Sequence, residues 1–302
     1  MNTTNQNPRI SVTELLGTPA STFEETLNAS GLNWEPKEDK VGGLDTAIAM
    51  PRKKLLYRSD NNQALGIVGS DYRPSDPREF LRTQFEFAEF SKGEVTRAGF
   101  IEDRSRAFAF VKLAEIKLPR EHRKVGDPVR AYIYSSDGWD GGTPRRSRLY
   151  LERLRCTNGM TSKEISASLW VSHTKNSEEQ YAVRWKKFLG EITAAVNTMK
   201  ERYTRLIQTP MTEGEMKTFL AKLVPGDTAQ AEKTRVSMLH LFSTGVGNEG
   251  NSRWDALNAV TEHTTHLRTF RETDSSSVTT NRFLGVVENS LLNDRAEELL
   301  LA

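Results

Sequence analysis

The chain has 302 residues, of which 36% are hydrophobic and 27% are charged. This composition is typical of a globular, rather polar protein that can bury a sizeable core, and it excludes fibrous and wholly disordered classes. Lysine and arginine number 42 against 40 aspartate and glutamate residues, and the net charge is +2. Total charge therefore favours no class of partner, and any basic surface must come from local clustering.

Cysteine usage and hydropathy indicate a cytoplasmic location. The single cysteine, Cys156, excludes an internal disulfide and suits a reducing compartment. No stretch approaches the roughly 18 consecutive apolar residues that a membrane span requires. Residues 1–10 also lack the basic start and apolar run of a secretion signal. We therefore expect a cytoplasmic protein with no membrane partner.

The first half of the chain predicts short helices followed by hairpins. Residues 12–17 and 23–32 have short helical patterns. Residues 53–72 read as a β-hairpin around the turn sequence Ser-Asp-Asn-Asn. A helix is expected over 77–92, where three phenylalanines recur at helical spacing. Residues 94–118 predict a second hairpin that turns at Glu-Asp-Arg.

The second half predicts further strands and then helices. Two strands flank a glycine-rich loop within residues 129–156, and a short strand is expected over 165–174. Residues 178–208 contain the longest helical pattern, and helical patterns dominate after it. Strands grouped before helices favour an α+β fold. We predict a curved antiparallel sheet of two hairpins plus further strands, packed on the long helix, with a mostly helical C-terminal part.

The same patterns divide the chain into three parts. Residues 1–50 form an N-terminal part of short helices and an extended segment, residues 51–208 form the α+β core, and residues 209–302 form the helical C-terminal region.

One strand combines unusual positive charge with an abrupt polar end. Leucines alternate with Arg148 and Tyr150, but Arg153 and Arg155 fall on the leucine side of the strand. A β-bulge near residues 152–153 would restore the alternation and leave one charged face. The Thr-Asn-Gly sequence that follows suits a tight turn, since asparagine and glycine tolerate left-handed backbone angles.

Basic clusters interleaved with aromatic residues are the strongest functional signal. Cations neutralise phosphates, and aromatic rings on the same strand face can stack bases of a single strand. Packing of the phenylalanine under a helix, and pairing of the arginines with nearby acids, is the competing structural interpretation. The candidate nucleic-acid-binding residues are Arg104, Arg106, Phe108, Arg146, Arg148, Arg153, Arg155, Arg184, Lys186 and Lys187.

The sequence predicts no catalytic residue, metal or cofactor. Cys156 and His173 could form a thiolate pair, but a lone cysteine is usually a small core residue. His263 and His266 are close in sequence, yet no further ligand spacing supports a metal. The glycine-rich loop 243–251 lacks a phosphate-loop signature, although its amides could approach a phosphate.

Four stretches together resemble the phage- and plasmid-borne family described as domain of unknown function 932. The family motifs match Gly69–Pro74, Arg153–Asn158, Ser172–Thr174 and Asn258–Glu262. Ser172 stands where the family often has arginine, so that charge is missing here. The resemblance covers roughly residues 50–300 and implies no particular reaction.

The order of helix, hairpin, helix, strands and long helix is also similar to the RecT and Red-beta single-strand annealing proteins. That resemblance implies binding to single-stranded DNA by a homo-oligomeric ring or filament. We therefore hypothesise a non-enzymatic DNA-binding protein of a phage or mobile element, active in single-strand annealing during recombination in the host cytoplasm. The alternative is a protein-interaction module, such as a phage-encoded inhibitor of a host defence system, that uses the C-terminal helices. A metal-dependent nuclease is a third hypothesis, but the scattered carboxylates show no matching spacing.

Overall fold

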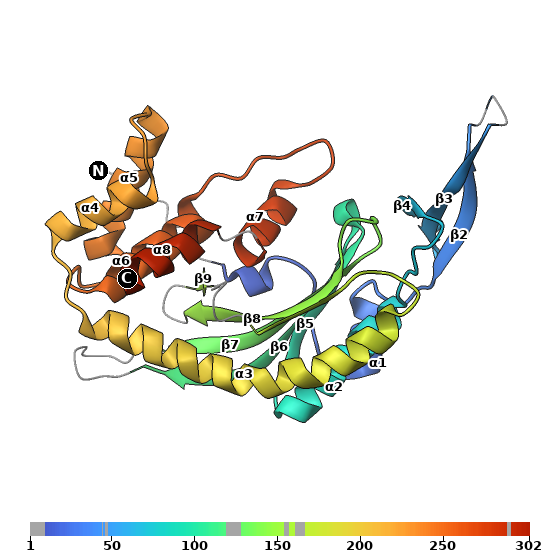
Figure 1. The fold of residues 1–302 in the computed structure, drawn as a ribbon, viewed down its shortest axis with the longest axis horizontal. Coiled ribbons are helices and arrows are strands. Elements are labelled where there is room, and N and C mark those ends of the chain that lie inside the picture. The colour runs from blue at the N-terminus through green and yellow to red at the C-terminus, as the bar shows by residue number, and fades with distance from the viewer. Residues whose placement is uncertain are drawn as a thin grey trace.

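Two antiparallel sheets and a set of helices make up the chain in the computed structural model, which describes residues 10–43, 45, 48–118, 128–153, 157–160, 167–288 and 291–302 (Figure 1). The main sheet has seven strands in the order β1-β5-β6-β7-β8-β10, and β9 pairs with the same edge of β8 as β10 does. Its strands are β1 (Thr18–Pro19), β5 (Glu94–Ile101), β6 (Arg106–Lys117), β7 (Pro128–Gly138), β8 (Arg145–Arg153), β9 (Asn158–Met160) and β10 (Ser168–Val171).

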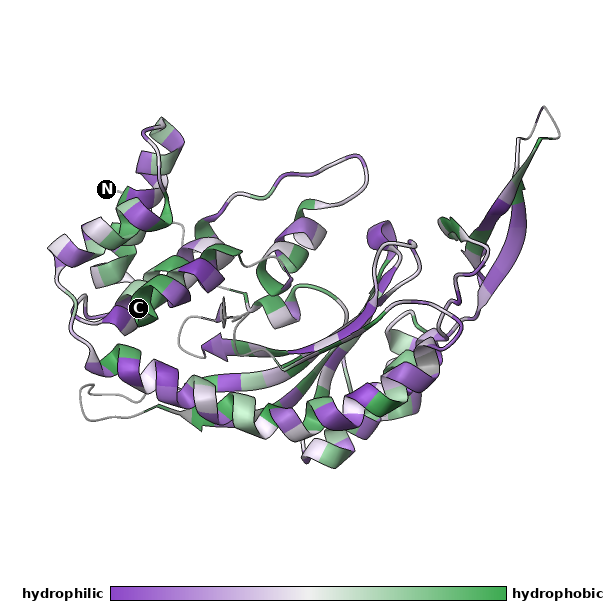
Figure 2. Cartoon of the chain, in the orientation of Figure 1, coloured by the Kyte–Doolittle hydropathy of each residue, from purple (hydrophilic) through white to green (hydrophobic). Residues whose placement is uncertain are grey.

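A second, three-stranded sheet contains β2 (Pro36–Gly42), β3 (Ala49–Arg58) and β4 (Ala64–Gly69), in that order. The predicted hairpin of residues 53–72 is therefore correct as a hairpin, but it does not join the main sheet. β3 pairs with β2 on one edge and with β4 on the other, so both edges of β3 are occupied within this sheet. The β2–β3 ribbon extends away from the body and is largely hydrophilic (Figures 1 and 2).

The helices are α1 (Phe23–Ala29), α2 (Pro77–Ser91), α3 (Ser177–Gln208), α4 (Glu213–Leu223), α5 (Ala229–Thr244), α6 (Arg253–Glu262), α7 (Val278–Val287) and α8 (Leu291–Leu301). Shorter helical turns are η1 (Val12–Glu14), η2 (Glu102–Arg104) and η3 (His263–Leu267). The α2 helix begins as predicted, because Asp76 accepts a hydrogen bond from the Arg78 amide and Pro77 occupies the first turn. The α+β prediction is confirmed.

Helices cover both faces of the main sheet. We call the face that packs on α2 and α3 the α3 face. Valine, isoleucine and leucine side chains of β6, β7 and β8 on this face share a core with the apolar stripe of α3. Phe80 and Phe87 of α2 are buried as predicted, but Phe90 is 67% exposed.

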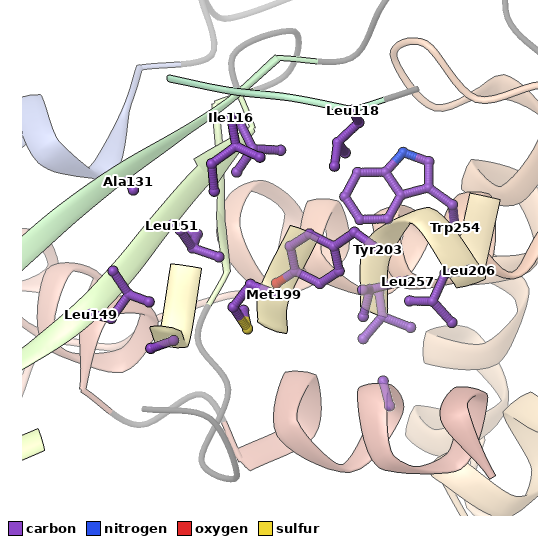
Figure 3. Close-up of a cluster of buried hydrophobic side chains, with 14 of the residues drawn as sticks. Ile116, Leu118, Ala131, Leu149, Leu151, Met199, Tyr203, Leu206, Trp254 and Leu257 are labelled. Carbon is purple, nitrogen blue, oxygen red and sulfur yellow. The ribbon is translucent and has the colours of Figure 1, made fainter. Parts of the chain in front are cut away.

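The C-terminal helices extend the same core. Trp254 and Leu257 of α6 pack beside Tyr203 and Leu206 of α3, next to Leu151 of β8 (Figure 3). The apolar stripe of the long helix α3 therefore packs against two different parts of the protein. Its first half lies along the sheet and its second half meets the C-terminal helices (Figure 1).

We call the opposite side of the main sheet the α7 face. Here Phe108, Phe110, Tyr134 and Tyr150 project from neighbouring strands and pack against Phe283 of α7. Gly159 of β9 allows this packing, because a Cβ at that position would collide with the Tyr150 hydroxyl and Val286 of α7. A helix and an aromatic layer thus cover the middle of the α7 face.

Candidate nucleic-acid interface

Three of the predicted arginines converge on one carboxylate at the end of α7. An Arg106 guanidinium nitrogen lies 2.7 Å from Glu288 Oε2, and one of Arg146 lies 3.8 Å from the same oxygen. The hydroxyl of Tyr134 donates a hydrogen bond to Glu288 Oε1 at 2.7 Å. Burial by itself would raise the pKa of Glu288, but the arginines and this hydroxyl hold it below its ordinary value. Glu288 is therefore an ionised carboxylate among several cations.

Arg148 is the third arginine of this cluster and lies deepest. Its guanidinium carbon lies 5.7 Å from the centre of the Tyr134 ring. Burial lowers the pKa of Arg148, although Glu288 partly offsets that effect. Among the described residues, its buried Nε and one terminal nitrogen have no hydrogen-bond partner. The arginine cluster, Arg106, Arg146 and Arg148, thus has more cationic and donor capacity than Glu288 alone satisfies.

The cluster borders an exposed edge of the main sheet. Trp170 of β10 is 58% exposed, and Arg146 is its direct partner on β8. Cross-strand partners share a face of the sheet, so the indole lies beside a guanidinium. The Arg146 side chain is itself 30% exposed.

Two cations of α3 lie on the other side of Trp170. Arg184 donates a hydrogen bond to the Trp170 carbonyl at 3.0 Å, and Lys187, which is 79% exposed, lies 3.6 Å from the carboxylate of Glu191. Both line a cavity of about 210 Å³ together with Trp170 and Phe188. We call Trp170, Arg146, Arg184 and Lys187 the β10 edge. The arrangement can hold a phosphate backbone electrostatically and offer one ring for stacking.

Other predicted site residues do not reach this surface. Phe108 is fully buried, with its ring 4.8 Å from that of Phe283, so the prediction that it stacks bases is wrong. Arg104 lies at the far tip of the hairpin and bonds to Ser276 and Asn281. Lys186 is exposed on α3 but lies outside the described cavity at the β10 edge, and Arg155 lies outside the described residues.

The predicted β-bulge near residues 152–153 is not present. The pairing of β7 with β8 runs without a register shift from Val129↔Arg153 to Ser136↔Arg146, so no bulge separates Arg153 from the leucines. Its side chain therefore enters the α3 face, where it is buried over the ring of Trp254. It donates hydrogen bonds to the carbonyls of Val246 and Gly247. The glycine-rich loop thus receives a guanidinium of this chain through its carbonyls.

The turn after this strand also differs in detail from the prediction. Thr157, with φ of 52°, has the left-handed conformation, whereas Asn158 and Gly159 already belong to β9. Asn158 is buried and donates long hydrogen bonds to the Asn258 carbonyl and the Thr261 hydroxyl of α6. The polar end of the strand therefore connects the sheet to α6.

A buried polar cluster that the sequence did not reveal lies on the α3 face. The fully buried Asp137 lies 3.0 Å from Nε2 of His173 and accepts a hydrogen bond from the Ser75 hydroxyl at 2.7 Å. Arg145 Nε lies 3.8 Å from the same carboxylate. Burial opposes the charged imidazole, but Asp137 outweighs it and raises the pKa of His173. Ser75 donates to the aspartate and not to the histidine, so the contact that activates a serine nucleophile is missing.

The four motif stretches meet in two pairs. The rings of Tyr72 and His173 stack at 4.8 Å, and the Arg73 amide donates to the His173 carbonyl. The second pair joins Asn158 to α6 as described above. Each pair connects a strand end to a distant segment, which is a structural role that no single motif indicates.

Two further findings concern metals and membranes. Within the described part of the chain, no group of three or more histidine, cysteine, aspartate or glutamate side chains is placed to hold a metal ion. His263 instead shares a hydrogen bond with Ser237. None of the helices in the described residues combines the length and apolar character needed to cross a bilayer.

Comparison with known proteins gives a family but no activity. Neither the curated proteins nor the solved structures contain a match to this chain. The model of one protein family, described as Domain of unknown function (DUF932), matches residues 64–284. All four motif stretches lie within those residues, which make up well over half of the sequence, and the chain therefore belongs to the DUF932 family.

Proposed function

We propose that this protein binds single-stranded DNA at the β10 edge and acts in single-strand annealing for a phage or mobile element in the host cytoplasm. One observation supports this most directly: the exposed Trp170 is the cross-strand partner of Arg146, and it lines a cavity with Arg184 and Lys187 of α3. The indole of Trp170 is 58% exposed, so its ring is accessible to a base. Base stacking on the indole and phosphate contacts to its neighbours need no covalent chemistry.

The location of the β10 edge also favours a strand rather than a duplex. β10 is the last strand in the order of the main sheet, and a small cavity lies beside it. A duplex hides its bases, whereas a single strand can place one base on the ring. The arginine cluster lies next to the β10 edge and adds positive potential to it.

Fluorescence anisotropy with a labelled oligonucleotide tests the proposal. We expect Trp170→Ala to weaken binding about tenfold, because stacking of a base on an aromatic ring contributes about 1–3 kcal/mol. The double variant Arg184→Ala/Lys187→Ala should weaken binding by a similar factor and flatten the dependence of affinity on salt concentration. Duplex DNA of equal length should bind less tightly.

Matched variants control for unspecific effects. Lys217→Ala removes an exposed cation of α4, and Val236→Ala removes an exposed apolar side chain of α5. Both should bind like the parent. The proposal is wrong if the parent binds no oligonucleotide at low salt, or if the Trp170 and Arg184/Lys187 variants bind as tightly as the two controls.

We further propose that the protein assembles through the second sheet. Ile48 and Met50 of the β2–β3 ribbon are 66% and 49% exposed, and the outer edges of β2 and β4 pair with no other described strand. Open strand edges with apolar neighbours favour pairing with a second copy. Light scattering after size exclusion should show an oligomer that Ile48→Glu/Met50→Glu converts to monomer, and a monomeric parent would refute this step.

A further inference from the structure

A cavity lies on the α7 face, at the end of the strands away from the β10 edge. Its volume is about 470 Å³, which is in the range of sites for small ligands. Strands β5, β6, β7 and β8 form its floor, and η1 forms one wall. The α7 helix, which covers the middle of this face, separates it from Arg146 and Trp170.

Strand register explains which side chains meet in this cavity. Lys112 of β6 lies opposite Tyr132 of β7, and Arg130 of β7 lies opposite Glu152 of β8. Arg97 of β5 pairs with Phe110 of β6, next to Lys112 along the same face. Four neighbouring strands therefore aim three cations and one buried carboxyl at one space.

The two guanidinium groups form no close ion pair within the described residues, although the Tyr132 hydroxyl and, less strongly, Glu152 and Glu115 raise the pKa of Arg130. Arg97 donates hydrogen bonds to the carbonyls of Leu16 and Gly17, which are uncharged acceptors. Arg130 reaches only the Tyr132 hydroxyl, at 3.4 Å. Within the described residues, neither arginine lies at ion-pair distance from a carboxylate, whereas Lys112 is paired with Glu94 at 3.1 Å. Two guanidinium forks at one cavity match the oxygens of a phosphate.

The same lining offers hydroxyl groups and two carboxyl groups, Glu152 on β8 and Glu14 on η1. The Ser11 hydroxyl donates to Glu152 Oε1, and the Tyr132 hydroxyl lies 3.3 Å from Oε2. Burial raises the pKa of Glu152, and it raises that of Tyr132 to about 12. The carboxyl oxygens of Glu152 can accept hydrogen bonds from ligand hydroxyls, as they do from Ser11 and Tyr132. Thr96 and Thr157 add further polar groups to the lining.

We propose that this cavity binds a sugar phosphate, with the phosphate between Arg97 and Arg130 and the sugar hydroxyls against Glu152 and Ser11. The site is separate from the β10 edge and does not depend on DNA binding. A free sugar phosphate and the sugar-phosphate part of a nucleotide share this chemistry. No planar ring is exposed in the cavity for a base to stack on, because Tyr132 is only 3% exposed.

Isothermal titration of the full chain tests the site with four probes: ribose 5-phosphate, adenosine 5′-monophosphate, ribose and inorganic phosphate. We expect ribose 5-phosphate to bind, and ribose and inorganic phosphate to bind at least tenfold more weakly, because each lacks half of the contacts. Tighter binding of adenosine 5′-monophosphate than of ribose 5-phosphate would identify the nucleotide as the source, and the reverse would identify a free sugar phosphate.

Single substitutions test whether the ligand contacts the residues proposed for it. Arg130→Gln should weaken ribose 5-phosphate about tenfold, the usual effect of losing one charge-assisted contact. Arg82→Gln, which removes an exposed arginine of α2, should leave it unchanged, and so should Trp170→Ala. The inference is overturned if neither phosphorylated probe binds at millimolar concentration, or if Arg130→Gln binds like the parent. Loss of DNA binding in Trp170→Ala with intact probe binding separates the two sites.

Discussion

The two faces of the main sheet treat charge in opposite ways. On the α3 face the charged groups are buried and have partners inside the protein, as for Asp137 with His173 and Ser75, and Arg153 with loop carbonyls. On the α7 face cations outnumber acids at both ends of the strands, and both ends open to cavities or to exposed side chains. An arginine on a strand is therefore available to an anionic ligand only where no acidic group of the protein already neutralises its charge.

Alternation along β8 produces this separation within one strand. Arg145 and Arg153 point to the α3 face, and Arg146 and Arg148 point to the α7 face. The first two are buried over aromatic rings of helices, Tyr181 and Trp254. Arginines that are neighbours in sequence therefore lie on opposite faces of the sheet and have different partners.

The α3 face should respond most strongly to loss of a charge. Asp137→Ala leaves His173, Arg145 and the Ser75 hydroxyl without their shared acceptor in a fully buried site. Breaking a buried ion pair by removing one partner costs about 3–5 kcal/mol. Urea denaturation should show a loss of this size in the free energy of unfolding, while Asp39→Ala on the exposed β2 should lose less than about 0.5 kcal/mol. Equal stability of the two variants would contradict the structural role of Asp137.

On the α7 face, loss of the negative charge of Glu288 should reduce the stability of the protein and increase its affinity for oligonucleotides. Glu288→Gln weakens the contacts to Arg106 and Arg146 and should lower the free energy of unfolding by about 2–3 kcal/mol at pH 7. The variant should also bind oligonucleotides more tightly, because three arginines then lack their acid.

The pH dependence of this effect has a definite sign. Since the folded protein lowers the pKa of Glu288, the contribution of the carboxylate is present above its ordinary pKa and is lost as the pH falls through the folded value. The difference between parent and variant should therefore shrink in acid. Glu86→Gln, at an exposed position of α2, serves as the control. A Glu288→Gln variant with unchanged stability and weaker DNA binding would contradict this role of Glu288.

Local patterns predicted the elements correctly, and tertiary pairing explains the errors. Helical spacing was sufficient for α3, and helical spacing with a capping residue was sufficient for α2, since those signals are local. The separate second sheet could not be predicted, because β2 is a largely exposed strand whose partner choice depends on both edges of β3. The position of Arg153 could not be predicted either, because it depends on the pairing of β8 with β7. A bulge was expected, and a continuous register was found.

The candidate site was predictable only in part. Clustering of Arg106, Arg146 and Arg148 followed from strand alternation, but their common acid, Glu288, lies 140 residues further along than Arg148. Trp170 was not among the predicted site residues, because exposure of a tryptophan on a strand depends on which strand forms the edge. The Asp137–His173 contact joins a loop-forming strand end to a distant segment, and no spacing in the sequence indicates it.

A smaller effect is expected at His173, and it should depend on pH. Asp137 raises the pKa of the imidazole in the folded protein, so its stabilisation is fully present below the ordinary pKa of histidine and is lost as the pH rises through the folded value. His173→Gln should therefore be less stable than the parent by about 1–2 kcal/mol at pH 6, the usual worth of a hydrogen bond to a charged group, and by less at pH 9. His240→Gln, on an exposed position of α5, should show no such trend. A gap that widens toward pH 9 would mean that the imidazole is neutral in the folded protein.

The smallest effect on stability is expected at Glu152, at the opposite end of the α7 face from Glu288. Burial raises the pKa of Glu152, so its favourable contribution is present in acid and is lost as the pH rises through the folded value. Glutamine resembles the protonated carboxyl, and Glu152→Gln should therefore equal the parent near pH 4 and match or exceed it by less than about 1 kcal/mol at pH 8. Glu14→Gln, an exposed neighbour at the same cavity, controls for the general change in charge. If Glu152→Gln is instead clearly less stable at pH 8, Glu152 is an ionised partner of Arg130, the guanidinium is already neutralised, and this end of the face resembles the α3 side after all.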